Sequence, residues 1–346
     1  GGYMHKGLLS LIFALFYPLT GLAASAPVMV FDLGQTVTST SKFQAALEIG
    51  LGRFLNYGVR GYSFNEVSKK LFTFIESADP RTDKEKAALA IRRNLEQRAH
   101  AHWDIEPKLM CDWHTNAKSP KQIKRILLKH LKHYQAPAAE KELLKGIVTM
   151  MFTPKKYINT TILIPEMVQF MQDCKALGCP IYLLTNWEAE SYDLLMKKFP
   201  HLQQLADGAV VSGKCRTLKP EPEIYEDLGR LMLEQGHGNL TDTVFLDDRA
   251  ENLEAARNNH GMTVIDWSTP ENPTPKVPNM ALVKTQFIKI LRDRGLHDLA
   301  EAYIIILNHR RQDQQPSFLG SIVAQIGSVA RMAAGIGQLF ARTVQA

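Results

Sequence analysis

Six side chains in this sequence have the types and the placement to do chemistry together. Each lies at the carboxyl end of a predicted strand or in the loop that follows one. They are Asp32, Thr185, Asn186, Lys219, Asp247 and Asp248. In a doubly wound parallel sheet, ligands collect beyond the carboxyl ends of the strands. We therefore expect these groups to meet at one edge of a sheet.

The three aspartates predict a metal site. Neighbouring carboxylates repel one another and are costly to keep ionised unless a cation is present. A ligand set of oxygens without nitrogen or sulfur favours a hard ion, so Mg²⁺ is the expected cofactor. Its expected side-chain ligands are Asp32, Asp247 and Asp248.

A lysine and a hydroxyl beside such a site are suited to an incoming phosphate. Lys219 supplies positive charge and Thr185 a hydrogen bond to phosphate oxygens. A carboxylate in this setting can also act as a nucleophile that forms an aspartyl phosphate. Asp32, in the stretch "VMVFDLGQTV", is either a structural cap at the end of its strand or that reacting group.

The bulk composition is that of an ordinary globular protein. The chain has 346 residues, 45% of them hydrophobic and 22% charged, which argues against wholesale disorder. The formal net charge is only +6, and the lysines between Lys121 and Lys132 recur at helical spacing, as on a solvated helix face. We therefore expect no nucleic-acid partner.

The four cysteines show no spacing typical of a zinc site or a redox pair. We expect free thiols, although a disulfide between Cys174 and Cys179 stays open at this point.

Residues 1–26 resemble a cloning remnant, Gly1 to Tyr3, followed by a signal peptide. From Met4 a short basic start leads into an apolar run from Leu8 to about Leu22 and then small residues. The run is shorter than the roughly 20 residues of a membrane-spanning helix. We expect export to a periplasm or secretion; the alternative is membrane association through an uncleaved N-terminal segment.

The hydropathy pattern predicts an α/β protein, a doubly wound parallel sheet with an inserted helical domain. Residues 27–40 and 155–270 alternate buried strands with amphipathic helices, which indicates a parallel sheet covered on both faces. Residues 41–154 carry apolar residues at helical spacing without a strand-like stretch, and we interpret them as an all-helical cap.

The C-terminal part has a different composition. Residues 271–315 comprise a proline-rich linker and one predicted helix, from about Ala281 to Asn308. Residues 316–346 form an amphipathic tail rich in small residues. This helical extension would permit membrane association, as would the N-terminal segment, but packing on the body of the protein or disorder is an equal alternative.

Four short stretches resemble the ordered motifs of the haloacid dehalogenase-like (HAD) hydrolase superfamily. They are "FDLGQTV", "YLLTNW", "TLKPEPEIYED" and "VFLDDRAEN". The longest interval lies between the first two, where that family inserts a helical cap. The resemblance covers residues 27–40 and 155–270, and it implies a Rossmann-like core.

The resemblance also implies roles for the six residues. Asp32 resembles the nucleophile, Thr185 and Asn186 the phosphate-binding second motif, and Lys219 a phosphate-binding and catalytic group that keeps Asp32 ionised. Asp247 and Asp248 resemble ligands of Mg²⁺, with Asp32 and the backbone carbonyl of Gly34 completing the set. The expected function is a magnesium-dependent phosphomonoester hydrolase, whose partner is a phosphorylated small molecule or a phosphoprotein.

The sequence departs from this family at Gly34. Many of the family's phosphatases carry a second aspartate there, two residues after the nucleophile, as the general acid. Related sugar-1-phosphate phosphatases also show "DLG". Either the leaving group is good, as in sugar-1-phosphates and aryl or tyrosyl phosphates, or a cap residue supplies the proton. The candidate cap residues are His100, His102, Asp104 and His114.

Two other functions stay open. The missing acid would suit a non-catalytic phosphate-binding or protein-interaction module built on the same fold, although the retained Asp32, Lys219, Asp247 and Asp248 argue for activity. Carbon–halogen hydrolysis uses the same nucleophile without a metal, and the Asp247–Asp248 pair argues against it.

Overall fold

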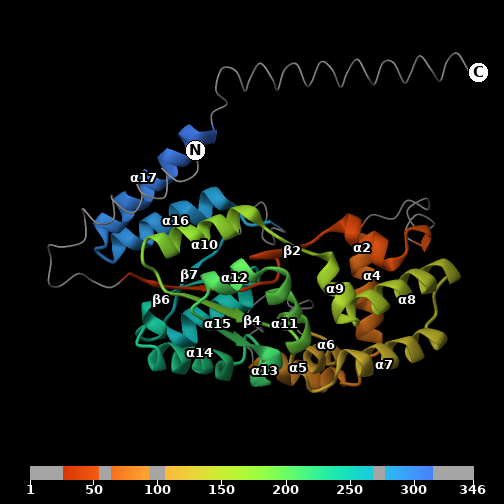
Figure 1. Cartoon of the computed structure of the whole chain (residues 1–346). Coiled ribbons are helices and arrows are strands. Elements are labelled where there is room, and N and C mark those ends of the chain that lie inside the picture. Colours follow the sequence, from red (N-terminus) through yellow and green to blue (C-terminus); the bar gives the residue numbers. More distant parts are fainter. Residues whose placement is uncertain (1–25, 54–63, 93–105, 268–276, 315–346) are drawn as a thin grey trace, which may run out of the picture. The chain divides into compact units, whose positions relative to one another are not determined.

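A computed structural model describes residues 26–53, 64–92, 106–267 and 277–314 (Figure 1). The chain falls into two compact units, 1–296 and 297–346. In the second unit the described part is one helix, α17 (His297–Gln314). The first unit contains the sheet, the cap helices and every predicted site residue. The predicted signal segment and the C-terminal tail lie outside the described residues. Within them, no helix combines the length and apolar character needed to cross a membrane.

The centre of the first unit is a five-stranded parallel sheet in the order β5-β4-β1-β6-β7. The strands are β1 (Val28–Phe31), β4 (Ile181–Thr185), β5 (Gly208–Val211), β6 (Thr243–Leu246) and β7 (Thr263–Ile265). The short apolar runs of the three central strands β1, β4 and β6 are buried throughout, as expected for a parallel sheet between helices, whereas the edge strands β5 and β7 are partly exposed. This architecture confirms the predicted α/β fold class.

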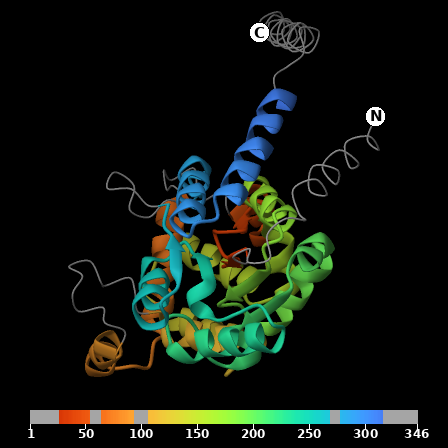
Figure 2. The same ribbon diagram turned by 90° about the vertical axis from the view of Figure 1, so that its left-hand side faces the viewer.

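Helices cover both faces of the sheet. They are α10 (Pro165–Ala176), α11 (Ala189–Lys198), α12 (Pro200–Leu205), α13 (Ser212–Cys215), α14 (Pro222–Glu234), α15 (Ala250–His260), α16 (Met280–Asp293) and a short 3₁₀ helix at Leu240–Asp242. Figure 1 and the turned view in Figure 2 place the sheet between a layer with α10 and α16 and a layer with α14 and α15.

Side chains that alternate along β1 explain the two layers. Val28 and Val30 join the apolar cluster that includes α14 and α15 residues, whereas Phe31 points the other way and packs edge-on against Phe170 of α10. Phe170 in turn contacts Phe287 of α16, with ring centroids 5.3 Å apart. β1 is therefore buried on both faces, and its position at the sheet centre is set by its apolar sequence.

A two-stranded antiparallel ribbon joins the sheet to the cap helices. β2 (Thr38–Thr40) pairs with β3 (Thr161–Leu163), so the chain leaves and re-enters the core at one place. Two backbone hydrogen bonds extend the ribbon: Ser41 N donates to Thr160 O and Ile164 N to Val37 O. This ribbon was not predicted from the sequence, because three-residue strands are too short to show a period of two.

The described helices between these two strands form a cap with its own apolar core. They are α2 (Lys42–Ile49), α4 (Phe64–Ser77), α5 (Asp83–Arg92), α6 (Lys108–His114), α7 (Pro120–His133), α8 (Ala138–Met151) and α9 (Pro154–Thr160). Phe74, Ile123 and Leu127 are fully buried in this core. Ser119 caps α7, because Ser119 and Gln122 form a reciprocal capping box.

The predicted single helix from Ala281 to Asn308 is wrong. The chain forms α16 and α17 with a break between Asp293 and His297. Gly295 adopts φ +73°, a left-handed conformation that glycine tolerates and that ends a helix. The four cysteines are free, as predicted.

Candidate active site

The three central strands bring the predicted carboxylates and the hydroxyl together. Asp32 follows β1 directly, Thr185 ends β4, and Asp247 and Asp248 follow β6. Since β1 lies between β4 and β6, these groups stand side by side at the carboxyl edge. The backbone N–H of Asp32 donates to Leu246 O at 2.9 Å, which continues the strand pairing up to the site.

Lys219 reaches this edge from the loop between α13 and α14. Its Nζ atom donates to Asp32 Oδ1 at 2.7 Å, to Asp247 Oδ2 at 2.6 Å and to the backbone carbonyl of Leu184 at 2.7 Å. All three donors of the ammonium group are thereby used. Although burial lowers the pKa of Lys219, the charges of Asp247 and Asp32 outweigh burial and hold this pKa above its usual value. The lysine therefore stays charged between the two carboxylates.

The two oxygens of Asp32 have different surroundings. Oδ1 accepts from Lys219 and, at 3.1 Å, from the Thr185 hydroxyl. No described residue donates a hydrogen bond to Oδ2, although Asp32 is only 5% exposed. Burial raises the pKa of Asp32 to about 6, against the opposing charge of Lys219 and with a further contribution from Asp247. One carboxylate oxygen is thus held in place while the other is available.

The two aspartates after β6 also differ. Asp247 is held by its neighbours: Arg249 N donates to Oδ1 at 2.8 Å, and Asn252 Nδ2 lies 3.0 and 3.1 Å from its two oxygens. No described residue donates a hydrogen bond to the Asp248 side chain. Burial raises the pKa of Asp248 well above its usual value, and the negative charges of Asp247 and Asp32 raise it further.

The geometry fits a divalent cation. Asp32, Asp247 and Asp248 each offer an oxygen, and these oxygens lie within 4.8 Å of one another. When all three are ionised, Lys219 neutralises one of the three negative charges, and a single divalent ion balances the remainder. Oxygen donors of this kind suit Mg²⁺.

Asn186 holds the backbone of Lys219. Its Nδ2 donates to Lys219 O at 2.9 Å, and Lys219 N donates to its Oδ1 at 2.8 Å. The side-chain amide is therefore engaged with Lys219. A direct contact between Asn186 and a phosphate remains a prediction.

Two aromatic residues that were not predicted from the sequence, Trp187 and Tyr157, lie near Gly34 and Asp32. A Cβ placed on Gly34 would lie 3.7 Å from Asp32 Oδ2 and 3.8 Å from the indole Nε1 of Trp187. Tyr157 of α9 packs on Trp187, with ring centroids 5.5 Å apart. Burial raises the pKa of Tyr157 to about 12, and the charge of Asp32 contributes. Trp187 directly follows Thr185 and Asn186 of the second motif, and this position could have indicated that it belongs to the site. No sequence pattern indicated the same for Tyr157.

Among the candidate cap acids, His114 is the one within the described residues. It lines a narrow pocket between cap and core together with Trp113, Tyr157, Asn186, Trp187, Glu188 and Ser191. Its Nδ1 lies 2.9 Å from a carboxylate oxygen of Glu106, and its backbone carbonyl accepts from the Ser212 hydroxyl of the core. His100, His102 and Asp104 lie outside the described residues.

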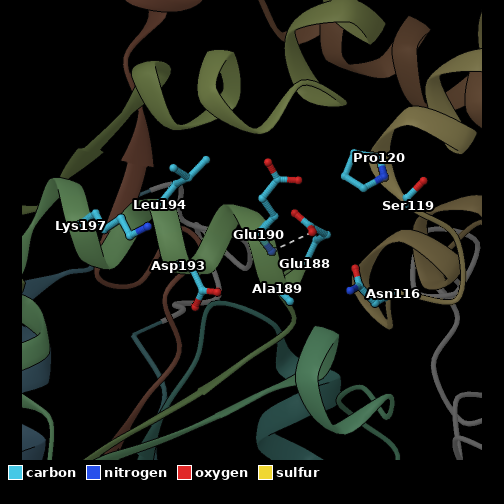
Figure 3. A pocket seen from close by; sticks show the side chains of 9 residues that line it. All are labelled: Asn116, Ser119, Pro120, Glu188, Ala189, Glu190, Asp193, Leu194 and Lys197. Carbon is cyan, nitrogen blue, oxygen red and sulfur yellow. Dashed lines mark hydrogen bonds between the residues drawn. The ribbon is translucent and has the colours of Figure 1, made fainter.

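A wider cleft of about 500 Å³ adjoins this pocket at Glu188, which lines both. Asn116, Ser119 and Pro120 of the cap form one side, and residues 188–197 at the start of and along α11 form the other (Figure 3). Glu188 is turned to the helix, accepting from Glu190 N and Ser191 N at 2.8 Å each. The cleft offers space between cap and core for the part of a substrate beyond its reacting group.

The sequence model of the haloacid dehalogenase-like hydrolases matches residues 27–260, more than half of the chain. The chain belongs to this family. The order of Asp32, Thr185, Lys219 and Asp247 along the chain and their meeting at one sheet edge agree with the motif resemblance described above.

Similar proteins include one curated relative and several solved structures. The sesquiterpene phosphatase astK of Aspergillus oryzae (strain ATCC 42149 / RIB 40) is 29% identical over 92 residues, which are 27% of this chain and 44% of the relative, so the match spans less than half of that protein. A HAD family enzyme from Bacteroides thetaiotaomicron, solved with magnesium and inorganic phosphate, is 13% identical with a TM-score of 0.41 over 72% of this chain and 97% of that one. A dehalogenase structure is 16% identical with a TM-score of 0.44 over 77% of this chain and 98% of that one.

Proposed function

We propose that this HAD-like hydrolase is a magnesium-dependent phosphomonoesterase with Asp32 as its nucleophile. The observation that carries the proposal is the asymmetry of Asp32: Oδ1 is fixed by Lys219 and Thr185, while Oδ2 has no partner among the described residues. A structural cap would use its oxygens on nearby backbone N–H groups. Asp32 instead uses one oxygen on a lysine from a distant loop and leaves the other open.

Each site residue has a role in the proposed reaction. Asp32 Oδ2 attacks phosphorus, and the bond between phosphorus and the leaving-group oxygen breaks, which gives an aspartyl phosphate and the free alcohol or phenol. The positive charge of Lys219 offsets the charge of the phosphoryl oxygens, and the Thr185 hydroxyl can turn from Asp32 Oδ1 to donate a hydrogen bond to one of them. Water then attacks the phosphorus of the intermediate, releasing inorganic phosphate and restoring Asp32.

Asp32, Asp247, Asp248 and the backbone carbonyl of Gly34 would hold Mg²⁺ at this edge. When bound, the ion supplies positive charge beside the phosphoryl group. The absence of a side chain at Gly34 limits the proposed substrates to those with a good leaving group: a sugar-1-phosphate, or an aryl or tyrosyl phosphate.

The name of the curated relative, a sesquiterpene phosphatase, supports phosphate-ester chemistry for this chain as well. A non-catalytic phosphate-binding or interaction module is the alternative, because Gly34 lacks the acid. The proposed partner and location rest on the sequence alone. The substrate would be a phosphorylated small molecule or a phosphoprotein. The enzyme would act outside the cytoplasm, or at a membrane to which residues 1–26 or 316–346 bind.

Hydrolysis of p-nitrophenyl phosphate tests the proposal. The nitrophenolate needs little protonation, so the substrate bypasses the missing acid. We expect turnover with Mg²⁺ that stops on chelation and falls at least about 1,000-fold in Asp32→Asn. Mg²⁺ binding without turnover above the Asp32→Asn level would overturn the enzymatic proposal and favour the binding module.

A further inference from the structure

The space above Gly34 is open and is bounded by two functional atoms. Among the described residues, a Cβ built on Gly34 meets only Asp32 Oδ2 at 3.7 Å and Trp187 Nε1 at 3.8 Å, both ordinary van der Waals distances. A methyl group would therefore fit there without a clash with these residues. In place of a residue-34 side chain, the indole N–H of Trp187 lies beside this space, which Asp32 Oδ2 also borders.

This indole N–H has no hydrogen-bond partner among the described residues, although Trp187 is 7% exposed. The nitrogen is not among the fully buried polar atoms, so a ligand that enters the narrow pocket lined by Trp187 and Trp113 can reach it. An accessible N–H donor without a protein acceptor is available for a hydrogen bond to such a ligand.

The position of Trp187 is fixed from two sides. Its backbone carbonyl accepts from Gly213 N at 2.9 Å and from the Ser212 hydroxyl at 3.3 Å. A Cβ on Gly213 would lie 2.8 Å from that carbonyl oxygen, so this close approach requires glycine. From the cap, the Tyr157 ring packs on the indole at a 40° tilt. The N–H is thus held in place before a substrate arrives, as electrostatic stabilisation requires.

We propose that the Trp187 indole N–H donates a hydrogen bond to the leaving-group oxygen, in the position that a general acid at residue 34 would serve. The inference rests on the proposed phosphatase function and assigns the substrate class. When the phosphorus–oxygen bond breaks, the oxygen leaves with the bonding electron pair. The indole keeps its proton and stabilises the developing charge, and the released phenolate takes a proton from water. The substrates are therefore aryl phosphates, whose leaving groups need no acid.

The dependence of rate on leaving-group basicity tests this inference. Phenyl phosphate and p-nitrophenyl phosphate would be compared in the wild type, in Trp187→Phe and in Trp267→Phe, a control at another buried tryptophan. Loss of one hydrogen bond should lower kcat about tenfold for phenyl phosphate and less than about threefold for p-nitrophenyl phosphate. An equal loss for both substrates would show that the indole only packs, and would overturn the inference.

A second pair of variants does not depend on the folding of Trp187→Phe. Gly34→Asp places an acid in the open space, and Gly34→Ala fills it without one. We expect Gly34→Asp to raise kcat for phenyl phosphate relative to p-nitrophenyl phosphate, and Gly34→Ala to leave their ratio unchanged. A ratio shifted equally in both variants contradicts the inference.

Turnover and ligand binding separate the role of Trp187 from the phosphatase function. If the wild type turns over neither substrate, the phosphatase proposal fails. Binding then decides the inference: phenyl phosphate added with Mg²⁺ should move one indole ¹H–¹⁵N resonance downfield, the one missing in Trp187→Phe. An unmoved Trp187 resonance overturns the inference.

Discussion

Asn186 and Lys219 hold each other through two reciprocal hydrogen bonds, from the Asn186 side-chain amide to Lys219 O at 2.9 Å and from Lys219 N to Asn186 Oδ1 at 2.8 Å. The pair connects the end of β4 with a loop that follows α13. It thereby fixes the backbone from which Lys219 reaches Asp32. The second motif, which contains Asn186, therefore fixes the position of the third motif, which contains Lys219.

Asn186→Ala should therefore lower kcat about 10- to 100-fold, as losses of supporting hydrogen bonds around reactive groups do. The nucleophile and the carboxylates stay, so residual Mg²⁺-dependent turnover should remain. Asn279→Ala is the matched control, because Asn279 caps α16 and accepts from Leu282 N. The control should lose stability by about 0.5–2 kcal/mol with an unchanged kcat. Equal kcat in both variants would argue that Lys219 needs no such support.

Lys219→Met should destabilise the metal-free protein strongly at pH 7.5. Removing the ammonium leaves Asp32 and Asp247 buried without their shared partner, a change that costs about 3–5 kcal/mol in other buried ion pairs. Urea unfolding in EDTA measures the effect. Lys175→Met breaks the partly exposed pair with Asp207 and should cost about 1 kcal/mol or less. Similar losses for the two lysines would contradict the central role of Lys219.

The sequence predicts the sheet and its polar edge because both depend on local patterns. The apolar run Val28–Phe31, for example, is followed by Asp32 and forms a strand that is buried on both faces. The ribbon β2–β3 could not be predicted, since its pairing joins Thr38 to Leu163 across the entire cap. Three-residue strands carry no periodic signal.

Within the site, too, residues in local sequence patterns could be predicted, and residues brought together only by folding could not. Asp32 and Asp247 are visible in the sequence because a carboxylate after an apolar run stands out. Tyr157 is not, since it lies on a short cap helix and meets Trp187 only through folding. The role of Asn186 was also hidden, because its partner is backbone rather than a side chain with a recognisable type.

Mg²⁺ affinity should fall as pH falls below about 6. Burial raises the pKa of Asp32 to about 6, so below this pH the metal must displace a proton from its own ligand. We expect a loss of roughly tenfold in affinity per pH unit in that range. Calorimetry in two buffers with different heats of ionisation measures both the affinity and the released protons. Affinity that is constant from pH 5 to 8, without proton release, would contradict the assigned ligand.

The same shift has a consequence for stability. The pKa of Asp32 is higher in the folded chain than the ordinary value of 3.8. Its stabilising contribution is therefore fully present below about pH 4 and is lost as pH rises through about 6. The rise in Tm on adding Mg²⁺ should accordingly be larger at pH 7.5 than at pH 5. An equal rise at the two pH values would show that Asp32 is already ionised at pH 5 in the metal-free protein, and would contradict the raised pKa.

Asp248→Asn should raise the Tm of the metal-free protein and remove most of its response to Mg²⁺. The substitution removes the repulsion that Asp248 meets from Asp247 and Asp32, together with one oxygen of the metal site. Differential scanning fluorimetry with EDTA or Mg²⁺ separates the two effects. Glu234→Gln removes one exposed negative charge at the end of α14 and should keep the Mg²⁺-induced shift of the wild type. A lower metal-free Tm in Asp248→Asn would mean that this carboxylate is held by a favourable contact rather than strained by its neighbours.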